Sequence, residues 1–347
     1  MSFLIYGASG YTGKLIVERA VKQGLKPTLA GRTENKIQPL AKEFGLDYLV
    51  FGLDNIDEIA MHLKSFPLVL NCAGPFSRTA KPMIKACLQA GTHYLDITGE
   101  IEVFELAKSY HQQAKDKNLI VMSGVGFDVV PTDCMAKYLH TQMPDATHLE
   151  LAFLGLGGSI SHGTMSTMVE GLGRSGAIRE NGKIVTKPTG QLGKVIDFGI
   201  KKHFAMTIPW GDVSTAFTTT AIPNIMVFTG VAKSSYNMMK MQFLFNPIVR
   251  LGFVKNQIQK YVDKNIVGPT AQQLENGKSL IYGKVTNANG LTKEARLETR
   301  EGYFLTAEMA LIITQKVLNN KLESGYQTPA KLFGYELILE MPNTKFV

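Results

Sequence analysis

The 347-residue chain has three cysteines, one tryptophan and no long apolar run. Cys72, Cys87 and Cys134 lack metal-ligand spacing and cannot all pair, so we expect no metal site and a reducing compartment. No run of about 18 apolar residues occurs, so no membrane-spanning helix is expected. The first residues lack the basic segment of a signal peptide. From these absences we expect a cytoplasmic protein.

The chain carries a formal net charge of +8 but lacks the sequence patterns of nucleic-acid recognition. It has no zinc-finger spacing, no RNP-type aromatic motif and no basic helix suited to a groove. Its positive charge suits an anionic partner such as NADP, a coenzyme A or carrier-protein thioester, or an anionic lipid. Apolar residues make up 45% of the chain, and its length suits two domains.

Three closely spaced glycines follow a short apolar run at the start of the chain. Residues 3–6 have the pattern of a strand buried on both faces, and residues 14–24 have that of a helix. Between them the backbone must turn and let a ligand approach, which glycine permits. Free N–H groups and the helix dipole there suit a phosphate, although a purely structural turn is the alternative. The expected cofactor-binding residues are Gly7, Ser9, Gly10, Tyr11, Thr12 and Gly13.

Strand-like and helical segments alternate over the first 140 residues. Six strands and five helices joined by short connections predict an α/β fold, a Rossmann parallel sheet with helices on both faces. Ligands of such sheets bind at the carboxyl ends of the strands. The glycine turn is therefore expected to hold a dinucleotide pyrophosphate.

The end of the second expected strand indicates which dinucleotide binds. Many NAD-binding folds place an acid there, whereas this chain has Gly31 followed by Arg32. An arginine pairs with the 2′-phosphate of NADP, so we expect NADP, with Arg32 at that phosphate and Lys36 as a helper. Glu34 lies close enough to keep NAD open. The residues expected to line the cofactor after the fourth strand are Ala73, Gly74 and Pro75.

Several short motifs are similar to those of a known oxidoreductase family. In order along the chain they are GASGYTGK, LAGR, NCAGPF, CLQAGTHYLDITGE and GFDVVPTD, followed by the later GTMSTMVEGL and TPAKLFGYEL. Together they resemble the saccharopine dehydrogenase-like oxidoreductases, which include trans-acting enoyl reductases of lipid synthesis. The resemblance implies an NAD(P)-binding Rossmann domain, a second α+β domain and reduction of a C=N, C=O or C=C bond. It does not imply saccharopine as the substrate.

Three segments are expected from this pattern. Residues 1–140 would form the NADP-binding Rossmann domain, and residues 141–325 an α+β domain for substrate and dimerisation. The C-terminal segment, residues 326–347, would pack back on the first domain. In the second domain we expect strands over residues 206–230, which are rich in β-branched and aromatic side chains, and a helix over residues 303–320.

Carboxylates near the strand ends are the main catalytic candidates. Glu100 follows the fifth strand and Asp128 the sixth, where a side chain can orient a substrate or relay a proton. His162, at the head of a helix in the second half, is the third candidate. Each has a structural alternative: a helix-start charge, a turn residue and a structural histidine, respectively. The YxxxK spacing of short-chain dehydrogenases occurs at Tyr236 and Lys240, but too late in the chain to be assigned.

Residues 234–264 combine methionines, aromatic residues and five cations with a single acid. Pro247 is expected to divide them into two helices. A basic amphipathic helix pair can contact a membrane peripherally or cover an apolar ligand. A helix buried in the core or at a homodimer interface is the alternative.

These observations predict an NADP-dependent oxidoreductase that transfers a hydride to a C=C, C=O or C=N bond of an apolar or carrier-linked substrate. The alternative is a non-catalytic NADP-binding protein that docks on lipid or a partner protein through residues 234–264. A third hypothesis is a dehydrogenase acting on an amino-acid-type imine. It needs basic groups aimed at a substrate carboxylate, for which Arg78 and Arg174 are the only candidates.

Overall fold

The structure, a computed structural model, describes residues 3–347. These divide into two units. Unit 1 comprises the residues up to Val130 together with Tyr303–Leu332, and unit 2 comprises Pro131–Gly302 and Phe333–Val347. The bounds differ from the expected domain limits, because the helical region after residue 302 belongs to unit 1. The C-terminal tail is divided between the two units.

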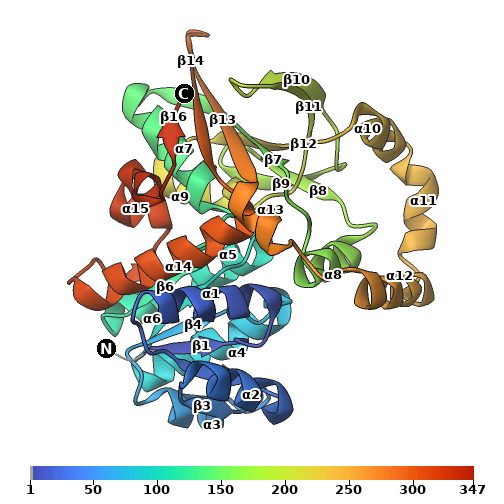
Figure 1. The fold of residues 1–347 in the computed structure, drawn as a ribbon. Coiled ribbons are helices and arrows are strands. Elements are labelled where there is room, and N and C mark those ends of the chain that lie inside the picture. The colour runs from blue at the N-terminus through green and yellow to red at the C-terminus, as the bar shows by residue number, and fades with distance from the viewer. Residues whose placement is uncertain (1–2) are drawn as a thin grey trace. The chain divides into compact units, whose positions relative to one another are not determined.

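Unit 1 is built on a seven-stranded parallel sheet (Figure 1). Its strands are β1 (Leu4–Tyr6), β2 (Thr28–Gly31), β3 (Tyr48–Val50), β4 (Leu68–Asn71), β5 (His93–Asp96), β6 (Ile120–Met122) and β15 (Gly325–Tyr326). The strand order is β15-β6-β5-β4-β1-β2-β3, and every neighbouring pair is parallel. The direction of winding reverses between β1 and β4, as in a Rossmann fold. The predicted fold class of the N-terminal half is confirmed.

Helices surround this sheet, so its central strands are buried along their whole length. The helices of unit 1 are α1 (Tyr11–Lys22), α2 (Glu34–Phe44), α3 (Ile56–Leu63), α4 (Phe76–Ala90), α5 (Ile101–Ser109), α6 (His111–Asp116) and α14 (Gly302–Asn319, whose first residue belongs to unit 2). A short helix, α15 (Pro329–Phe333), follows near the end of the unit. Across residues 3–347, none of the helices combines the length and the apolar character needed to cross a membrane.

The C-terminal part of unit 1 packs against its N-terminal part through specific contacts. Arg19 of α1 forms an ion pair with Glu308 of α14, and its guanidinium lies 3.6 Å from the ring centroid of Phe304. The Thr306 hydroxyl accepts a hydrogen bond from the backbone N–H of Phe127 at 3.0 Å. These contacts explain why α14 belongs to unit 1.

Unit 2 contains a nine-stranded mixed sheet, which confirms the expected α+β second domain. Its strands are β7 (Ala146–Leu156), β8 (Gly176–Glu180), β9 (Lys183–Lys187), β10 (Gly193–Asp197), β11 (Lys202–Thr207), β12 (Asn224–Gly230), β13 (Lys278–Asn287), β14 (Thr292–Arg300) and β16 (Lys345–Phe346). The main path runs β10-β11-β12-β7-β13-β14-β16, while β8 pairs with β12 and β9. The tight turn of the β8–β9 hairpin is at Asn181-Gly182, where both residues have positive φ.

Helices cover part of this second sheet. They are α7 (Val130–Gln142), α8 (His162–Gly171), α9 (Asp212–Thr220), α10 (Lys233–Lys240), α11 (Gln242–Val249), α12 (Gly252–Asn265) and α13 (Ala271–Asn276), followed near the C-terminus by the 3₁₀ helix η1 (Tyr335–Glu340). Helix α7 approaches β13 so closely that a Cβ on Gly283 would lie 2.5 Å from the Leu139 side chain. Two buried hydrogen bonds, Thr132 to Asp212 and Thr219 to Asp133, join α7 to α9.

Two local expectations in unit 2 are wrong. Residues 212–220 form α9 rather than a strand, although threonine favours strands. The Thr220 hydroxyl donates to the carbonyl of Ala216 four residues earlier, so burial within a helix leaves this polar group satisfied. Pro247 lies inside α11 instead of dividing two helices, and that helix ends two residues later. The segment therefore contains three helices.

Two threonines of α14 provide a test of this packing. The hydroxyl of Thr314 is fully buried and has no hydrogen-bond partner among the described residues. Thr314→Val removes that unsatisfied group, so we expect the free energy of unfolding to rise by about 1 kcal/mol. Thr306→Val loses the hydrogen bond from the Phe127 N–H and should lower the free energy of unfolding by about 1–2 kcal/mol. Urea denaturation measures both changes, and equal effects of the two substitutions would contradict this packing.

Candidate functional site

The turn after β1 is shaped by contacts that leave no room for side chains. Gly7 has φ +81°, and its N–H donates to the carbonyl of Ala30 at 2.8 Å. A Cβ on Gly7 would lie 2.7 Å from the backbone nitrogen of Ala73, at the end of β4. A Cβ on Gly13 would lie 2.4 Å from the carbonyl oxygen of Gly7. The backbones at the carboxyl ends of β1 and β4 therefore touch where the strand order reverses.

The first turn of α1 presents backbone N–H groups without competing side chains. Its N-cap, Gly10, supplies no side-chain hydrogen bond, and no acid lies in the first turn. Ser9 and Gly10 are exposed, whereas Tyr11 and Thr12 are half-buried. The Tyr11 ring packs edge-on against Tyr303, with 5.3 Å between centroids. This glycine cradle at a helix N-terminus fits a dinucleotide pyrophosphate.

The loop after β4 is held in place by its neighbours. The side-chain oxygen of Asn71 accepts from the N–H of Ala73 at 3.1 Å, and the Thr79 hydroxyl donates to the Ala73 carbonyl at 2.6 Å. The peptide between Gly74 and Pro75 is cis. Gly74 is exposed, and Ala73 and Pro75 are half-buried, so the loop is accessible to a ligand. Nothing in residues 71–75 conflicts with the predicted cofactor contact.

The end of β2 presents positive charge to solvent. Arg32 and Lys36 are both exposed, and neither forms an ion pair with another residue in the described part of the chain. Arg32 lies near enough to Tyr6 to oppose the effect of burial, which raises the pKa of that phenol to about 12. Glu34 instead accepts a hydrogen bond from the Tyr48 hydroxyl at 3.4 Å. The competing acid thus has a partner, which favours Arg32 as the group that meets a cofactor.

A buried polar network connects the ends of three strands. The hydroxyl of Tyr94 donates to Asp96 at 2.7 Å, and the Asn71 amide donates to Tyr94 at 3.3 Å. Asp96 also accepts from the Ser123 hydroxyl and from the N–H groups of Thr98 and Gly124, at 2.9–3.0 Å. Burial raises the pKa of Asp96, while these hydrogen bonds lower it. This network joins residues up to 28 positions apart, so no short motif in the sequence shows it.

Glu100 caps a helix. Its two carboxylate oxygens accept from the N–H groups of Phe76 and Ser77, at 2.9 and 3.0 Å, in the first turn of α4. Burial raises the pKa of Glu100, and these two bonds oppose that rise. The geometry favours the structural alternative that the sequence left open, although the helix is α4 rather than the one that Glu100 precedes. A catalytic role for Glu100 remains a prediction.

Asp128, the second carboxylate candidate, lies close to the turn at Gly99, and its catalytic role stays a prediction. It lies in the turn before α7, and a Cβ on Gly99 would come within 2.6 Å of its Oδ2 atom. Burial, and secondarily the charge of Glu100, raises the pKa of Asp128 to about 7. A group with this pKa exchanges protons readily near neutral pH.

His162 belongs to unit 2, whereas Glu100 and Asp128 belong to unit 1. Its Nε2 atom lies 2.8 Å from Oδ1 of Asp263, so it joins the start of α8 to the end of α12. A hydrogen bond from Gln259 and this contact both lower the pKa of Asp263. The ion pair favours the structural role, and the catalytic role of His162 stays a prediction.

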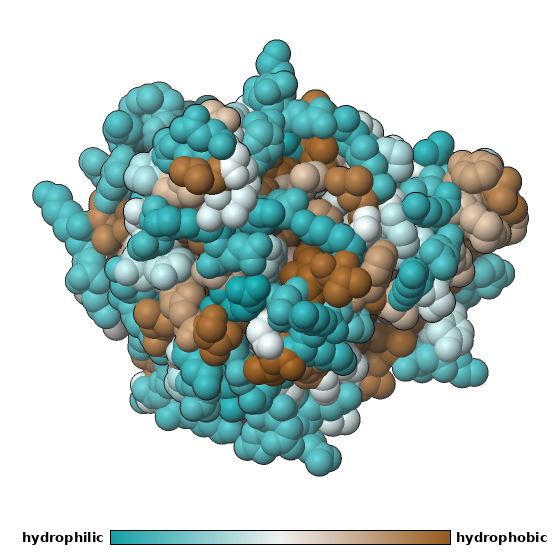
Figure 2. Space-filling view, turned by 90° about the horizontal axis from the view of Figure 1, so that it is seen from above, coloured by the Kyte–Doolittle hydropathy of each residue, from teal (hydrophilic) through white to brown (hydrophobic). Residues whose placement is uncertain are grey.

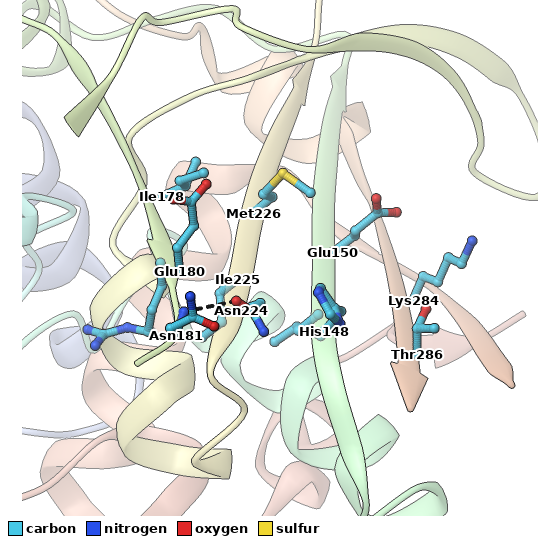
Figure 3. A pocket seen from close by; sticks show the side chains of 12 residues that line it. His148, Glu150, Ile178, Glu180, Asn181, Asn224, Ile225, Met226, Lys284 and Thr286 are labelled. Carbon is cyan, nitrogen blue, oxygen red and sulfur yellow. Dashed lines mark hydrogen bonds between the residues drawn. The ribbon is translucent and has the colours of Figure 1, made fainter. Parts of the chain in front are cut away.

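Unit 2 has an open pocket of about 600 Å³ that contains none of the predicted site residues (Figure 3). It lies over β7, β12 and β13 beside the β8–β9 hairpin, where His148, Glu150 and Lys284 project from the sheet. Several of its polar groups already have partners. The side chain of Asn224 accepts from the N–H of Asn181 at 2.9 Å, and Glu150 pairs with Lys194. Part of the polar lining of this pocket is therefore already engaged within the protein.

Comparison with protein families identifies the domain that holds the glycine turn. The model described as "Saccharopine dehydrogenase NADP binding domain" matches residues 3–122. This part of the chain is similar to that family over the matched residues. The match confirms the predicted cofactor class, because the family is described by its binding of NADP.

Curated relatives are similar over about half of the chain. A saccharopine dehydrogenase-like oxidoreductase of Mus musculus is 30% identical over 207 residues, which cover 51% of this chain and 47% of that protein. A lipid droplet localized protein of Caenorhabditis elegans is 31% identical, covering 50% and 45%, respectively. A trans-acting enoyl reductase of Mycobacterium bovis is 27% identical, covering 53% and 48%. The chain spans about half the length of these relatives, and the resemblance seen in its motifs is confirmed.

A solved structure shows the same fold over the whole chain. Saccharopine dehydrogenase (L-Glu forming) of Saccharomyces cerevisiae is 12% identical and has a TM-score of 0.64, covering 100% of this chain and 99% of that chain. At this identity the likeness concerns the fold alone.

The expected cytoplasmic location is wrong as judged by the relatives. One of them is named as a lipid droplet localized protein. The inference failed because few cysteines and the absence of a spanning helix do not distinguish the cytoplasm from an organelle or a lipid surface.

Gly13→Ala tests the cradle. The added Cβ would displace the Gly7 carbonyl, so we expect at least a tenfold loss of NADPH affinity by fluorescence titration, while the melting temperature shows whether the protein still folds. Gly24→Ala is the matched control. Gly24, unlike Gly13, has a positive φ, and a Cβ there would meet open space at the end of α1, so the substitution should cost about 1 kcal/mol of stability without affecting affinity. Unchanged affinity in a folded Gly13→Ala protein would contradict the cradle.

Asp128→Asn tests the raised pKa through the pH dependence of stability. In the folded protein the Asp128 carboxyl group keeps its proton up to about pH 7. In the unfolded chain it loses the proton near pH 3.8, the ordinary pKa of an aspartate. The wild-type protein should therefore lose stability relative to the variant as pH rises from about 4 to about 7, with a constant difference above that. Urea denaturation across this pH range measures the difference in the free energy of unfolding between the two proteins. A pH-independent difference for Asp128→Asn would refute the shift.

Proposed function

We propose that this protein is an NADPH-dependent oxidoreductase that transfers a hydride to a C=C, C=O or C=N bond of an apolar or carrier-linked substrate. The observation that supports it best is the glycine cradle at the reversal point between β1 and β4, within a domain whose family binds NADP. We further propose that unit 1 holds the cofactor and that unit 2 serves the substrate.

The cofactor would be bound mainly by backbone groups. The turn from Gly7 to Gly13 would hold the pyrophosphate at the N-terminus of α1, and Arg32, helped by Lys36, would pair with the 2′-phosphate. The loop from Ala73 to Pro75 would border the nicotinamide side. When bound, NADPH supplies the hydride, and the chain's own residues need only hold the reacting carbon close and manage charge and protons.

Asp128 is the proposed proton donor. Reduction of a double bond needs a proton as well as a hydride, and a carboxyl with a pKa of about 7 holds a proton on roughly half of the molecules at neutral pH. Its position against the turn at Gly99 places it at the carboxyl end of the sheet, where ligands of this fold bind. Glu100 would support Asp128 in two ways. Its negative charge would help to raise the pKa of Asp128, and its hydrogen bonds to the N–H groups of Phe76 and Ser77 would hold the start of α4.

The substrate class rests on two independent indications. One relative is named as a trans-acting enoyl reductase, which favours a C=C bond in an acyl group. The net charge of +8 suits the phosphate groups of a coenzyme A or carrier-protein thioester. A non-catalytic NADP-binding protein is the second candidate, because α10–α12 expose apolar side chains suited to docking.

Cofactor specificity and hydride transfer can be measured together. We expect Arg32→Asp to weaken NADPH binding about 10- to 100-fold and to leave NADH binding nearly unchanged, because only NADPH carries the 2′-phosphate.

With NADPH deuterated at C4, wild-type protein should place deuterium in the product of an enoyl, keto or imino thioester, as read by mass spectrometry. Asp128→Asn should lower kcat at neutral pH without changing NADPH affinity.

The control for Arg32 is Lys42→Asp, which changes charge equally on the exposed surface of α2 and should not discriminate between the nucleotides. Tight NADPH binding without deuterium transfer to any acceptor would favour the non-catalytic candidate. Failure to bind either nucleotide would overturn both.

A further inference from the structure

Helices α10, α11 and α12 and the two residues that follow, residues 233–267, expose an unusual amount of apolar surface; we call this segment the arm. Ten of the twenty large apolar side chains that are exposed within residues 3–347 lie between Met238 and Val267. The strongest concentration covers α11 and the start of α12, with exposed fractions from 45% to 69%. These residues are Phe243, Leu244, Phe245, Ile248, Leu251 and Phe253.

Several polar side chains of the arm form hydrogen bonds to the rest of unit 2. Arg250 donates to the carbonyl of Gly173 at 2.8 Å, and Lys255 donates to that of Glu170 at 2.8 Å. Further contacts of this kind join Gln242 to Thr189, Gln259 to Ser166 and Asp263 to His162. An ordinary surface helix buries its apolar side chains, whereas the arm attaches to unit 2 partly through polar groups and leaves large apolar side chains exposed.

Only a few apolar side chains anchor the arm. Tyr236 of α10 is buried and packs against the ring of Phe204, with 4.9 Å between centroids. Val262 of α12 is 2% exposed, and no residue of α11 is buried. The arm is thus fixed at both ends, while its middle helix has no apolar cover. In Figure 2, hydrophobic residues, drawn in brown, gather at the right-hand edge where the arm lies.

The charge of the arm selects among the partners that could cover this surface. Residues 233–265 carry six cations and a single acid, Asp263, which is paired with His162. A second copy of the chain in a two-fold contact would bring two such cationic segments together, which is unfavourable. An anionic surface that also accepts apolar side chains complements both properties.

We infer that the arm docks the protein on anionic phospholipid membranes. The exposed side chains of α11 and the start of α12 insert among the acyl chains, and the exposed cations, including Lys240, Lys260 and Lys264, pair with lipid phosphates. The contact is peripheral, because the helices are too short to cross a bilayer. This inference does not depend on hydride transfer.

Vesicle co-sedimentation of the full chain tests this docking. We expect binding to phosphatidylcholine vesicles with about 30% phosphatidylserine, and at least tenfold weaker binding to phosphatidylcholine alone or at about 0.5 M salt. The double variant Phe243→Ser, Phe245→Ser should bind at least tenfold more weakly, as should Lys240→Glu, Lys260→Glu. All four positions are exposed, so the variants should fold with unchanged NADPH affinity.

Matched controls separate the arm from the rest of the surface. Val195→Ser, Ile200→Ser changes two exposed apolar residues of unit 2, and Lys183→Glu, Lys201→Glu changes two exposed cations; both should bind vesicles like the wild type. Absence of wild-type binding to anionic vesicles, or equal losses in arm and control variants, would overturn the inference. A dimer in light scattering that Phe243→Ser, Phe245→Ser dissociates, without vesicle binding, would assign the surface to a second copy instead.

Discussion

The backbone contact between Gly7 and Ala73 is the constraint on which the candidate site depends. The ends of β1 and β4 approach so closely that even one methyl group on Gly7 would overlap with the loop after β4. Helices α1 and α4 begin here, directly after β1 and β4. The strands that follow β1 lie on one side of this point in the sheet, and the strands that follow β4 lie on the other. A ligand at this position meets the backbone directly, so recognition needs few side chains, and the sequence signal is correspondingly limited to glycines.

The buried carboxylate of Asp96 extends this rigid frame to the next strands. Moving an ionised carboxyl group out of water is costly, and here two hydroxyl and two N–H donors from Tyr94, Ser123, Thr98 and Gly124 offset the cost. Those donors come from β5 and from the segments that follow β5 and β6, so one side chain fixes the ends of both strands. Burial raises the pKa of both carboxyl groups, but within residues 3–347 Asp128 has no such set of donors, and its pKa rises to about 7.

Local patterns in the sequence were sufficient for most of unit 1 but not for its limits. Residues 3–6 and the glycines after them predicted β1 and its turn, because burial on both faces and the need for close approach leave a local signature. By contrast, α14 is apolar on most of its surface, so its periodicity could not show that it packs on α1 through Arg19 and Glu308. The cap that Glu100 provides also joins residues 24 positions apart. Such long-range contacts are set by the fold and not by any short motif.

The arm shows the same limit in a form that bears on function. Periodicity over residues 234–264 indicates that one helix face is apolar, but it cannot indicate which face meets the protein. The structure settles this, because it leaves the apolar side chains from Phe243 to Phe253 exposed while Lys255 and Gln259 bond to the rest of unit 2. An apolar face that points outward lowers the solubility of a protein. Such a face is therefore unfavourable unless a partner or a membrane covers it. For a protein proposed to act on an apolar substrate, docking on a lipid surface would place it where such molecules are concentrated.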